Sequence, residues 1–316
     1  MKSNATDWKE HRIGIHKIRQ YRNPVKPHPM VTLSMMAPYT IILFVFIIIP
    51  IIAAIVISFT SFNMIQTPKY IGAQNYMYML LSDDIFLLAL KNTIIFALIT
   101  GPVGYILSFF IAWMLNEFGG KLRAFLTLVF YMPTLAGNVY FIWTYLFSGD
   151  SYGLVNSFAL RLGIIKEPIM WLTDTRYNFW VCIALLLWSS LGVGFLSIVA
   201  AMKSLNKELS EAGAIDGIRN RFQELFHIVL PQMLPALTFA AVMTISTSFT
   251  VGYQIMQLTG FPSTDYSVHT IVLHIMDYGM MRYEMGYASA LAVVLFLLLI
   301  IVWRYISLLL RKISSD

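Results

Sequence analysis

The sequence has few charged residues and almost no cysteine. Asp, Glu, Lys and Arg make up 12% of the 316 residues, hydrophobic residues make up 58%, and the mean hydropathy is +0.70. This balance lies far outside the usual range of soluble domains, so the composition predicts a polytopic membrane protein. Cys182 is the only cysteine, which excludes an intrachain disulfide and a cysteine-based metal site.

Ionisable side chains are missing from the apolar cores of the long hydrophobic runs. Proton relays and voltage sensors depend on such groups inside the membrane, so neither is evident here. A run of about 20 residues is long enough to cross a bilayer as a helix, in which every backbone group is satisfied internally. Such runs predict an all-α membrane protein with six transmembrane helices, at residues 33–60, 91–116, 124–147, 177–202, 233–257 and 285–310.

Signatures of enzymes and nucleotide sites are also missing. Gly119, Gly120 and Lys121 lack the upstream Gly and the following Ser or Thr of a phosphate-binding loop, and no zinc-protease or serine-hydrolase motif occurs. Asp83 and Asp84 are typical of a helix start rather than of a catalytic pair. We therefore expect no catalytic residue, no metal site and no cofactor in this chain, so that energy for uphill transport has to come from another chain.

The basic residues predict the orientation in the membrane. Most of the 22 Lys and Arg residues precede the first run, lie in the connectors at 121–123 and 203–221, or follow the last run. The positive-inside rule places these segments, and both termini, in the cytoplasm. Residues 1–30 are then a basic cytoplasmic tail and residues 31–316 a membrane domain. Because the basic residues are spread along one membrane face, no nucleic-acid partner is expected.

The polar connector at residues 203–232 is too hydrophilic to cross a bilayer. Residues 208–215 favour a short helix, Gly217 favours a turn, and residues 222–230 favour a second helix that ends before Pro231. This pattern predicts a bent, two-helix projection on the cytoplasmic face.

The connector resembles the EAA loop of membrane subunits of binding-protein-dependent ABC importers, most closely the carbohydrate-uptake, maltose-type branch. That loop reads E-A-A, three residues, Gly, a spacer and I-x-L-P. The stretches YIGAQNYMYML, ALKNTIIF, GFPSTDYSVHT and YEMGYASALAVVLF are similar to the same branch, which extends the resemblance over most of residues 30–310. Two features depart from the pattern: Gly replaces its third residue, and the spacer is one residue longer. The matching loop residues are Glu211, Ala212, Gly213, Asp216 and Gly217, followed by Ile228, Leu230 and Pro231.

The resemblance implies a permease subunit of an ATP-driven importer in a bacterial cytoplasmic membrane. Its implied partners are ABC ATPase subunits that carry ATP and Mg²⁺, a second homologous permease subunit, an extracytoplasmic solute-binding protein and a carbohydrate, expected to be an oligosaccharide. It also implies that Glu211, Ala212, Gly213, Asp216 and Gly217 dock the ATPase. Composition alone leaves open a self-contained secondary carrier or channel for small polar solutes.

Uncharged polar and aromatic residues inside the spans are candidates for a sugar path, because sugars offer hydroxyl groups and apolar ring faces. We expect Ser246, Thr250 and Tyr253 to share one helical face, and Trp188 to be the best sugar contact. Helix packing through Ser and Thr is the alternative interpretation. In an outer loop, the candidate contacts for the binding protein are Phe261, Pro262, His269, Asp277 and Tyr278, and a folded lid over the cavity is the alternative. The full set of path candidates is Trp188, Ser189, Ser190, Ser246, Ser248, Thr250, Tyr253 and Gln254.

Overall fold

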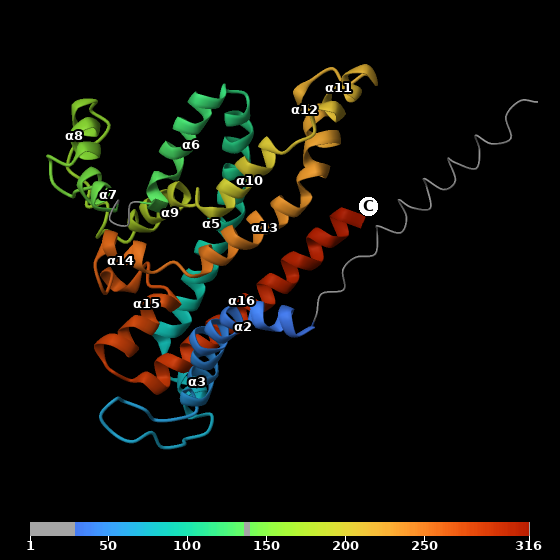
Figure 1. Cartoon of the computed structure of the whole chain (residues 1–316). Coiled ribbons are helices and arrows are strands. Elements are labelled where there is room, and N and C mark those ends of the chain that lie inside the picture. The colour runs from blue at the N-terminus through green and yellow to red at the C-terminus, as the bar shows by residue number, and fades with distance from the viewer. Residues whose placement is uncertain (1–28, 136–139, 316) are drawn as a thin grey trace, which may run out of the picture. The chain divides into compact units, whose positions relative to one another are not determined.

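The computed structural model describes residues 29–135 and 140–315, and nearly all of them are helical (Figure 1). The predicted basic tail lies, up to residue 28, outside the described residues. No sheet forms within the described ranges, where the one β-type pairing is an isolated bridge between Thr60 and Tyr70. By its internal contacts the chain divides into residues 1–53 and 54–316.

The helices are joined by connections of unequal length, of which residues 58–73 and 162–177 are the longest between described helices. In chain order they are α2 (Pro29–Leu43), the π turn η1 (Phe44–Ile48), α3 (Ile49–Ile57), α4 (Gln74–Leu81), α5 (Asp84–Asn116), α6 (Gly120–Leu135), α7 (Tyr140–Leu146), α8 (Leu154–Arg161), α9 (Asn178–Ser189), α10 (Val193–Lys203), α11 (Lys207–Ile215), α12 (Arg221–Glu224), the π turn η2 (Leu225–Val229), α13 (Leu230–Phe249), α14 (Tyr253–Thr259), the 3₁₀ turn η3 (Thr264–Tyr266), α15 (Ile271–Met276), the π turn η4 (Asp277–Met281) and α16 (Met285–Ser315).

Five helices are long and apolar enough to cross a membrane, and α6 with α7 makes up to six if that bent pair is one span. This result confirms the predicted all-α membrane class. The third span, predicted as one run at 124–147, is instead two helices whose axes differ by 88°. The other spans are Met30–Ile57, Asp84–Asn116, Asn178–Lys203, Arg221–Phe249 and Met285–Leu308.

The second span begins seven residues earlier than predicted. Asp83 is its N-cap, and Asp83 Oδ1 accepts a hydrogen bond from the Phe86 N–H at 2.9 Å. This bond satisfies one of the N–H groups that a helix start leaves without an internal partner. Asp83 therefore marks a helix start, as predicted, and α5 reaches 33 residues, or about 50 Å.

The fourth span is interrupted near its middle. Helix α9 ends at Ser189 and α10 begins at Val193, with Ser190, Leu191 and Gly192 between them. The Thr134 hydroxyl of α6 donates to the Leu191 carbonyl at 3.3 Å, which satisfies one of the backbone groups released by the break. Broken helices of this kind are tolerated at membrane depth where protein or a cavity meets the freed backbone groups.

The fifth span differs most from the sequence prediction. The helix expected to end before Pro231 runs on through Pro231 and Pro235 as far as Phe249. Pro231 lies at the first turn of α13, directly after the π turn, where a missing N–H does little harm. At the other end the predicted span 233–257 is cut, because Thr250, Val251 and Gly252 separate α13 from α14.

The packing of α5 against α10 and α13 forms the centre of residues 54–316 (Figure 1). Small residues allow these helices to approach closely. A methyl group added at Gly104 would lie 2.7 Å from Ser190 Cβ, and one added at Gly194 would lie 2.8 Å from Thr244 Oγ1. Such close contact is typical of helix pairs in membranes, where packing rather than hydrophobic burial holds helices together.

Candidate functional site

An uncharged polar hollow lies at the two helix breaks. Its volume is about 290 Å³, and a smaller hollow of about 60 Å³ shares part of its lining. Both are bordered by Ser189, Ser190, Thr244, Thr247 and Gln254. Thr134 and Tyr140 add to the first and Thr100 and Ser248 to the second, and no ionisable group other than the Tyr140 phenol is among the described lining residues.

The hollow has unused hydrogen-bonding capacity. Thr244 Oγ1 is buried and has no hydrogen-bond partner among the described residues. A buried hydroxyl without a partner costs free energy, typically about 1–3 kcal/mol, unless a solvent molecule or a ligand reaches it. The hydroxyl and amide groups that border the two hollows suit an uncharged molecule that offers hydroxyl groups.

Four of the eight predicted path residues line these hollows: Ser189, Ser190, Ser248 and Gln254. The others do not. Thr250 ends α13 and Tyr253 begins α14, so the prediction that Ser246, Thr250 and Tyr253 share one helical face is wrong. The prediction assumed an unbroken helix, which Gly252 interrupts.

Trp188 and Tyr253 make ring contacts beside the hollows. The Trp188 ring lies 5.6 Å from that of Trp143, between ring centres, and the Tyr253 ring lies 6.4 Å from that of Tyr140. Trp188 packs against the hydrophobic core that contains Cys182, and it is not a lining residue. Its assignment as the best sugar contact is therefore not supported by its position.

Sequence reasoning missed Thr244 and Thr247, although a signal for them existed. Thr244 is four residues from Ser248 and Thr247 is three residues from Thr244, and residues three or four apart share a helix face. Centring the polar face of α13 on Ser248 instead of Ser246 would have included them. Tyr140 and Thr134 could not be found this way, because the bent α6 and α7 pair brings them to the hollow.

The polar connector is built much as its sequence predicts. Asn206 caps α11 by accepting the Glu208 N–H at 3.0 Å, and α11 spans the predicted 208–215. Beyond Asp216, Gly217 has φ +99°, and the Ile218 N–H donates to the Gly213 carbonyl at 2.9 Å. This bond pattern, with Gly in the left-handed region, is the Schellman ending of a helix.

The second half of the connector starts with a further cap. Asn220 Oδ1 accepts the Gln223 N–H at 2.8 Å, and the Gln223 side chain accepts the Arg219 N–H at 2.9 Å. These reciprocal bonds fix the entry into α12. The π turn η2 follows, and because a π turn holds one residue more than an α turn, it can take up the extra spacer residue before Pro231.

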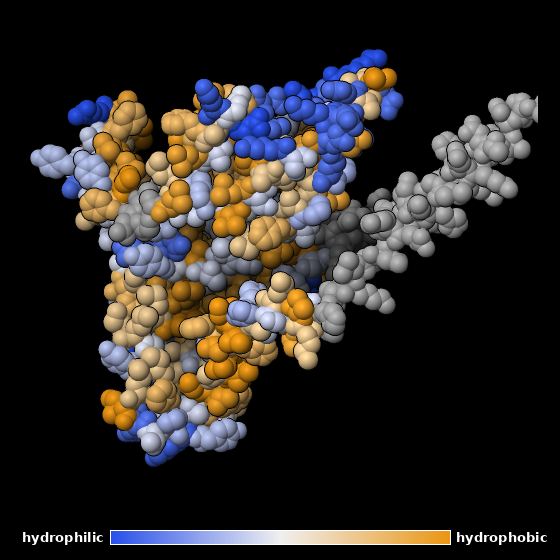
Figure 2. Space-filling view, viewed as in Figure 1, coloured by the Kyte–Doolittle hydropathy of each residue, from blue (hydrophilic) through white to orange (hydrophobic). Residues whose placement is uncertain are grey.

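Helix α11 presents most of the predicted docking residues to solvent. Glu211, Ala212, Asp216 and Gly217 are exposed, and Ile215 is 87% exposed although it is apolar. In Figure 2 hydrophilic residues dominate the surface over α11 and α12. A shallow groove of about 480 Å³ runs between these helices, lined by Ser210, Glu211, Ala214, Ile218, Arg219, Asn220, Arg221 and Glu224.

Gly213 does not belong to this surface. It is buried, and a methyl group added there would lie 2.5 Å from Ile228 Cδ1 and 3.0 Å from Ile218 Cδ1. The close approach that Gly213 permits is therefore to its own chain, not to a partner. This contact gives a reason for Gly in place of Ala at the third motif position.

A buried polar cluster that the sequence did not reveal lies at the start of α5. Asp83 Oδ2 accepts hydrogen bonds from His274 Nε2 at 2.8 Å and from the Tyr287 hydroxyl at 2.6 Å, and His269 lies 3.3 Å beyond His274. Burial acts to raise the pKa of the Asp83 carboxyl, but the bonds from Tyr287 and His274 outweigh it and hold the pKa below its ordinary value. His269 and Tyr278 are buried, so they are not available as contacts for a binding protein.

Comparison with known proteins identifies the chain. The family model for the binding-protein-dependent transport system inner membrane component matches residues 101–315. The chain belongs to this family. It is thus the membrane permease subunit of an ABC importer, in which separate subunits hydrolyse ATP, and the predicted family is confirmed.

Several relatives match along most of their length. The probable ABC transporter permease protein YesP of Bacillus subtilis is 31% identical over 288 residues, which cover 89% of each chain. The probable starch degradation products permease AmyD of Thermoanaerobacterium thermosulfurigenes is 30% identical and covers 84% of this chain and 89% of its own. The lactose permease LacF of Rhizobium radiobacter is 29% identical, with 83% and 88% covered.

Solved structures show the same fold. A bacterial ABC transporter that imports the acidic polysaccharide alginate matches with a TM-score of 0.72 and 22% identity, covering 90% of this chain and 96% of that one. The alginate transporter in complex with a pentasaccharide-bound periplasmic protein matches with a TM-score of 0.74. These similarities confirm the helical permease architecture.

Proposed function

We propose that this permease carries an uncharged oligosaccharide across a bacterial cytoplasmic membrane. The observation that carries the proposal is the hollow at the breaks in the fourth and fifth spans, where hydroxyl and amide groups stand among apolar lining residues. Transporters often bind their substrates at discontinuous helices, where freed backbone and polar side chains meet. Relatives named for starch products, lactose and arabinooligosaccharides support the sugar class.

The absence of formal charge in the lining favours a neutral sugar. Anionic saccharides are commonly bound by Arg or Lys side chains, and no basic side chain is among the described residues that border the hollows. At about 290 Å³ the larger hollow is at the small end for a ligand site, so one chain holds only part of the passage. A second, homologous permease subunit completes it, and an extracytoplasmic binding protein delivers the sugar.

The loop 203–232 is the docking element for the partner ATPase, which carries ATP and Mg²⁺. Exposed Ile215 supplies an apolar anchor, and Glu211 and Asp216 supply charge beside it. The positive-inside rule supports a cytoplasmic position for this loop and for both termini. Closure of the ATPase dimer then moves the loop, and rocking of the spans exposes the hollow to alternate sides.

The docking assignment is tested by Gly217→Val. A β-branched residue resists φ +99°, so the loop changes shape while the spans remain intact. We expect the variant to insert in the membrane, to lose the co-purifying ATPase and to lose uptake. Gly163→Val is the matched control, because Gly163 also has positive φ (+67°) with open space around it but lies in another connector. Normal ATPase association in Gly217→Val would refute the assignment.

The substrate assignment is tested by uptake into proteoliposomes that contain the whole transporter. Labelled maltotriose, lactose and arabinotriose are compared with an alginate trisaccharide. We expect uptake of at least one neutral sugar, and a roughly tenfold loss with Thr244→Val, which removes the unpartnered hydroxyl at nearly constant volume. Preference for the acidic trisaccharide would overturn the neutral-sugar assignment. ATP-independent uptake by this chain alone would instead indicate a secondary carrier.

A further inference from the structure

We propose that the Glu117–Arg221 ion pair, with the Trp113–Phe222 ring contact beside it, transmits movement of the docking loop to α5. The proposal rests on the function proposed above, in which the loop binds the ATPase. Arg221 Nη2 of α12 lies 3.0 Å from Glu117 Oε2, at the carboxyl end of α5. The rings of Trp113 and Phe222 lie 5.6 Å apart, between centres. Both contacts join segments about a hundred residues apart in the sequence.

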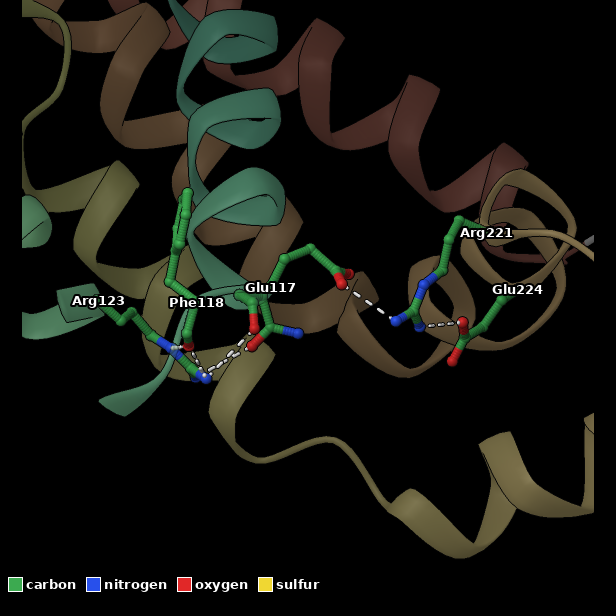
Figure 3. A network of polar contacts seen from close by, with 6 residues as sticks. Glu117, Phe118, Arg123, Arg221 and Glu224 are labelled. Atoms are coloured by element: carbon green, nitrogen blue, oxygen red, sulfur yellow. Dashed lines mark hydrogen bonds and ion pairs between the residues drawn. The ribbon is translucent and has the colours of Figure 1, made fainter. Parts of the chain in front are cut away.

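The end of α5 is held firmly on its own side. Arg123, in the first turn of α6, donates to the Asn116 carbonyl at 3.2 Å, to the Phe118 carbonyl at 3.1 Å and to Asn116 Oδ1 at 3.1 Å (Figure 3). The Asn116 carbonyl is one of the groups that a helix end leaves without internal partners, and Phe118 follows two residues beyond that end. Because Arg123 fixes them, a pull on Glu117 acts on the whole helix end rather than on a frayed turn.

The Glu117–Arg221 ion pair can break and re-form easily. Figure 3 shows the Glu117 side chain extended toward Arg221, and the two side chains are 49% and 65% exposed. An ion pair in water is weak, so it forms and breaks readily. Arg221 also binds Glu224 at 2.9 Å and keeps that partner when Glu117 leaves. Within residues 29–135 and 140–315 Glu117 has no second ion-pair partner, and a carboxylate at a helix carboxyl end is disfavoured by the helix dipole.

Space for the movement exists between the loop and the spans. A hollow of about 450 Å³ is bordered by both members of the ion pair and by Trp113, together with residues from the ends of α10 and α6. A loop that rotates about its start at Asn206 changes the Glu117–Arg221 distance directly. Both members of the ion pair border this hollow, so the distance between them depends on the position of the loop.

Helix α5 carries such movement to the sugar path. Thr100 lines the smaller hollow, and a methyl group added at Gly101 would lie 2.9 Å from Ser248 Oγ. Packing this close transmits displacement, because protein interiors yield little before neighbouring groups move. The route therefore runs from Arg221 through Glu117 and α5 to the helix breaks, separately from the direct continuation of α12 into α13.

The test uses the complete transporter, with its ATPase and binding protein, in proteoliposomes. Glu117→Gln, Arg221→Gln and the double variant are compared for three readouts: ATPase co-purification, ATP hydrolysis, and uptake of whichever of maltotriose, lactose and arabinotriose is taken up fastest. We expect each single variant to keep the ATPase and to lose roughly threefold to fivefold in sugar transported per ATP hydrolysed, as suits an exposed pair. The double variant should lose no more than Arg221→Gln alone, since both changes break one link.

Lys121→Gln, an exposed charge in the first turn of α6, is the control and should retain the unaltered ratio. An unchanged ratio in Glu117→Gln and Arg221→Gln, or additive losses in the double variant, overturns the link while leaving the docking assignment in place. Loss of the ATPase from Glu117→Gln would make Glu117 a docking residue and would also overturn it. If no ATPase co-purifies with the unaltered chain, the proposed function and the link both fail.

Discussion

The two ends of α5 carry opposite kinds of charged contact. At the amino end, the side chains of Asp83 and His274 are 4% and 1% exposed, and Asp83 has all its bonds inside the protein. At the carboxyl end, Glu117 and Arg221 meet largely in water. A carboxylate is favoured by the helix dipole at the first end and disfavoured at the second.

This difference separates a permanent structural contact at the amino end of α5 from a releasable contact at its carboxyl end. A buried charge with several hydrogen bonds cannot be released without a large cost, because either partner left alone is an unsatisfied buried group. An exposed pair can be released for little. Helix α5 is thus anchored at Asp83 to α15 and α16, whereas its other end can follow the loop. The comparison predicts effects on stability at one end and on coupling at the other.

The largest effect is expected from Asp83→Asn. An amide cannot accept from His274 and Tyr287 with the strength of a carboxylate, and an amide N–H turned toward them would force both groups to reverse their hydrogen bonds. We expect the free energy of unfolding, measured by SDS titration in mixed micelles, to fall by about 3 kcal/mol. Asp84→Asn is the matched control, because Asp84 is exposed, and should change it by less than about 0.5 kcal/mol. Equal effects at the two positions would remove the distinction.

A smaller loss is expected from Tyr287→Phe. This change deletes the 2.6 Å hydrogen bond to Asp83 but keeps the ring, which packs 4.5 Å from that of Tyr278, between centres. A hydrogen bond to a charged group contributes about 1.5–3 kcal/mol, and His274 still serves Asp83, so we expect a loss near the lower value. Additive losses in the Asp83→Asn, Tyr287→Phe double variant would show that the two side chains do not act together.

Low pH should lower the free energy of unfolding through the buried polar cluster at the amino end of α5. Burial lowers the pKa of His269 to about 4, and the titratable and charged groups facing it are His274, Asp83 and Arg282. A lowered histidine pKa gives stability that is complete above the unfolded value of about 6.5 and declines as the pH falls toward 4. We expect a loss of about 1 kcal/mol at pH 5.5 relative to pH 7. His269→Gln should flatten this dependence; an unchanged slope would contradict the assignment.

The sequence predicts the parts of this fold that local chemistry determines. The cap of α11, the turn at Gly217 and the helix start at Asp83 each depend on residues that are close together in the sequence. The sequence alone is therefore enough to predict them. Membrane spans are equally visible, because length and hydropathy define them. Four of the eight expected path residues line the hollows: Ser189 and Ser190 flank the break after α9, Ser248 lies in α13 and Gln254 lies in α14. Their role in a sugar path stays a prediction.

What the sequence cannot show depends on distant partners or on helix breaks. His274 and Tyr287 lie 191 and 204 positions from Asp83, and Arg221 lies 104 positions from Glu117. Hydropathy does not mark a break either, so α13 and α14 were read as one helix and Pro231 as a helix end. The π turn before Pro231 lets the helix continue through a residue that usually stops one.

The smallest effect on stability is expected at the other end of α5, and it decides whether the comparison holds. Glu117→Gln removes one exposed ion pair, leaves the Arg123 bonds to the helix end in place and relieves a negative charge at a helix carboxyl end. The lost attraction and the relieved repulsion oppose each other, so the free energy of unfolding should change by less than about 0.5 kcal/mol in the same SDS titration. Transport per ATP should nevertheless fall. If Glu117→Gln destabilised the protein as much as Asp83→Asn, Glu117 would make a second permanent structural contact, and α5 could not follow the loop.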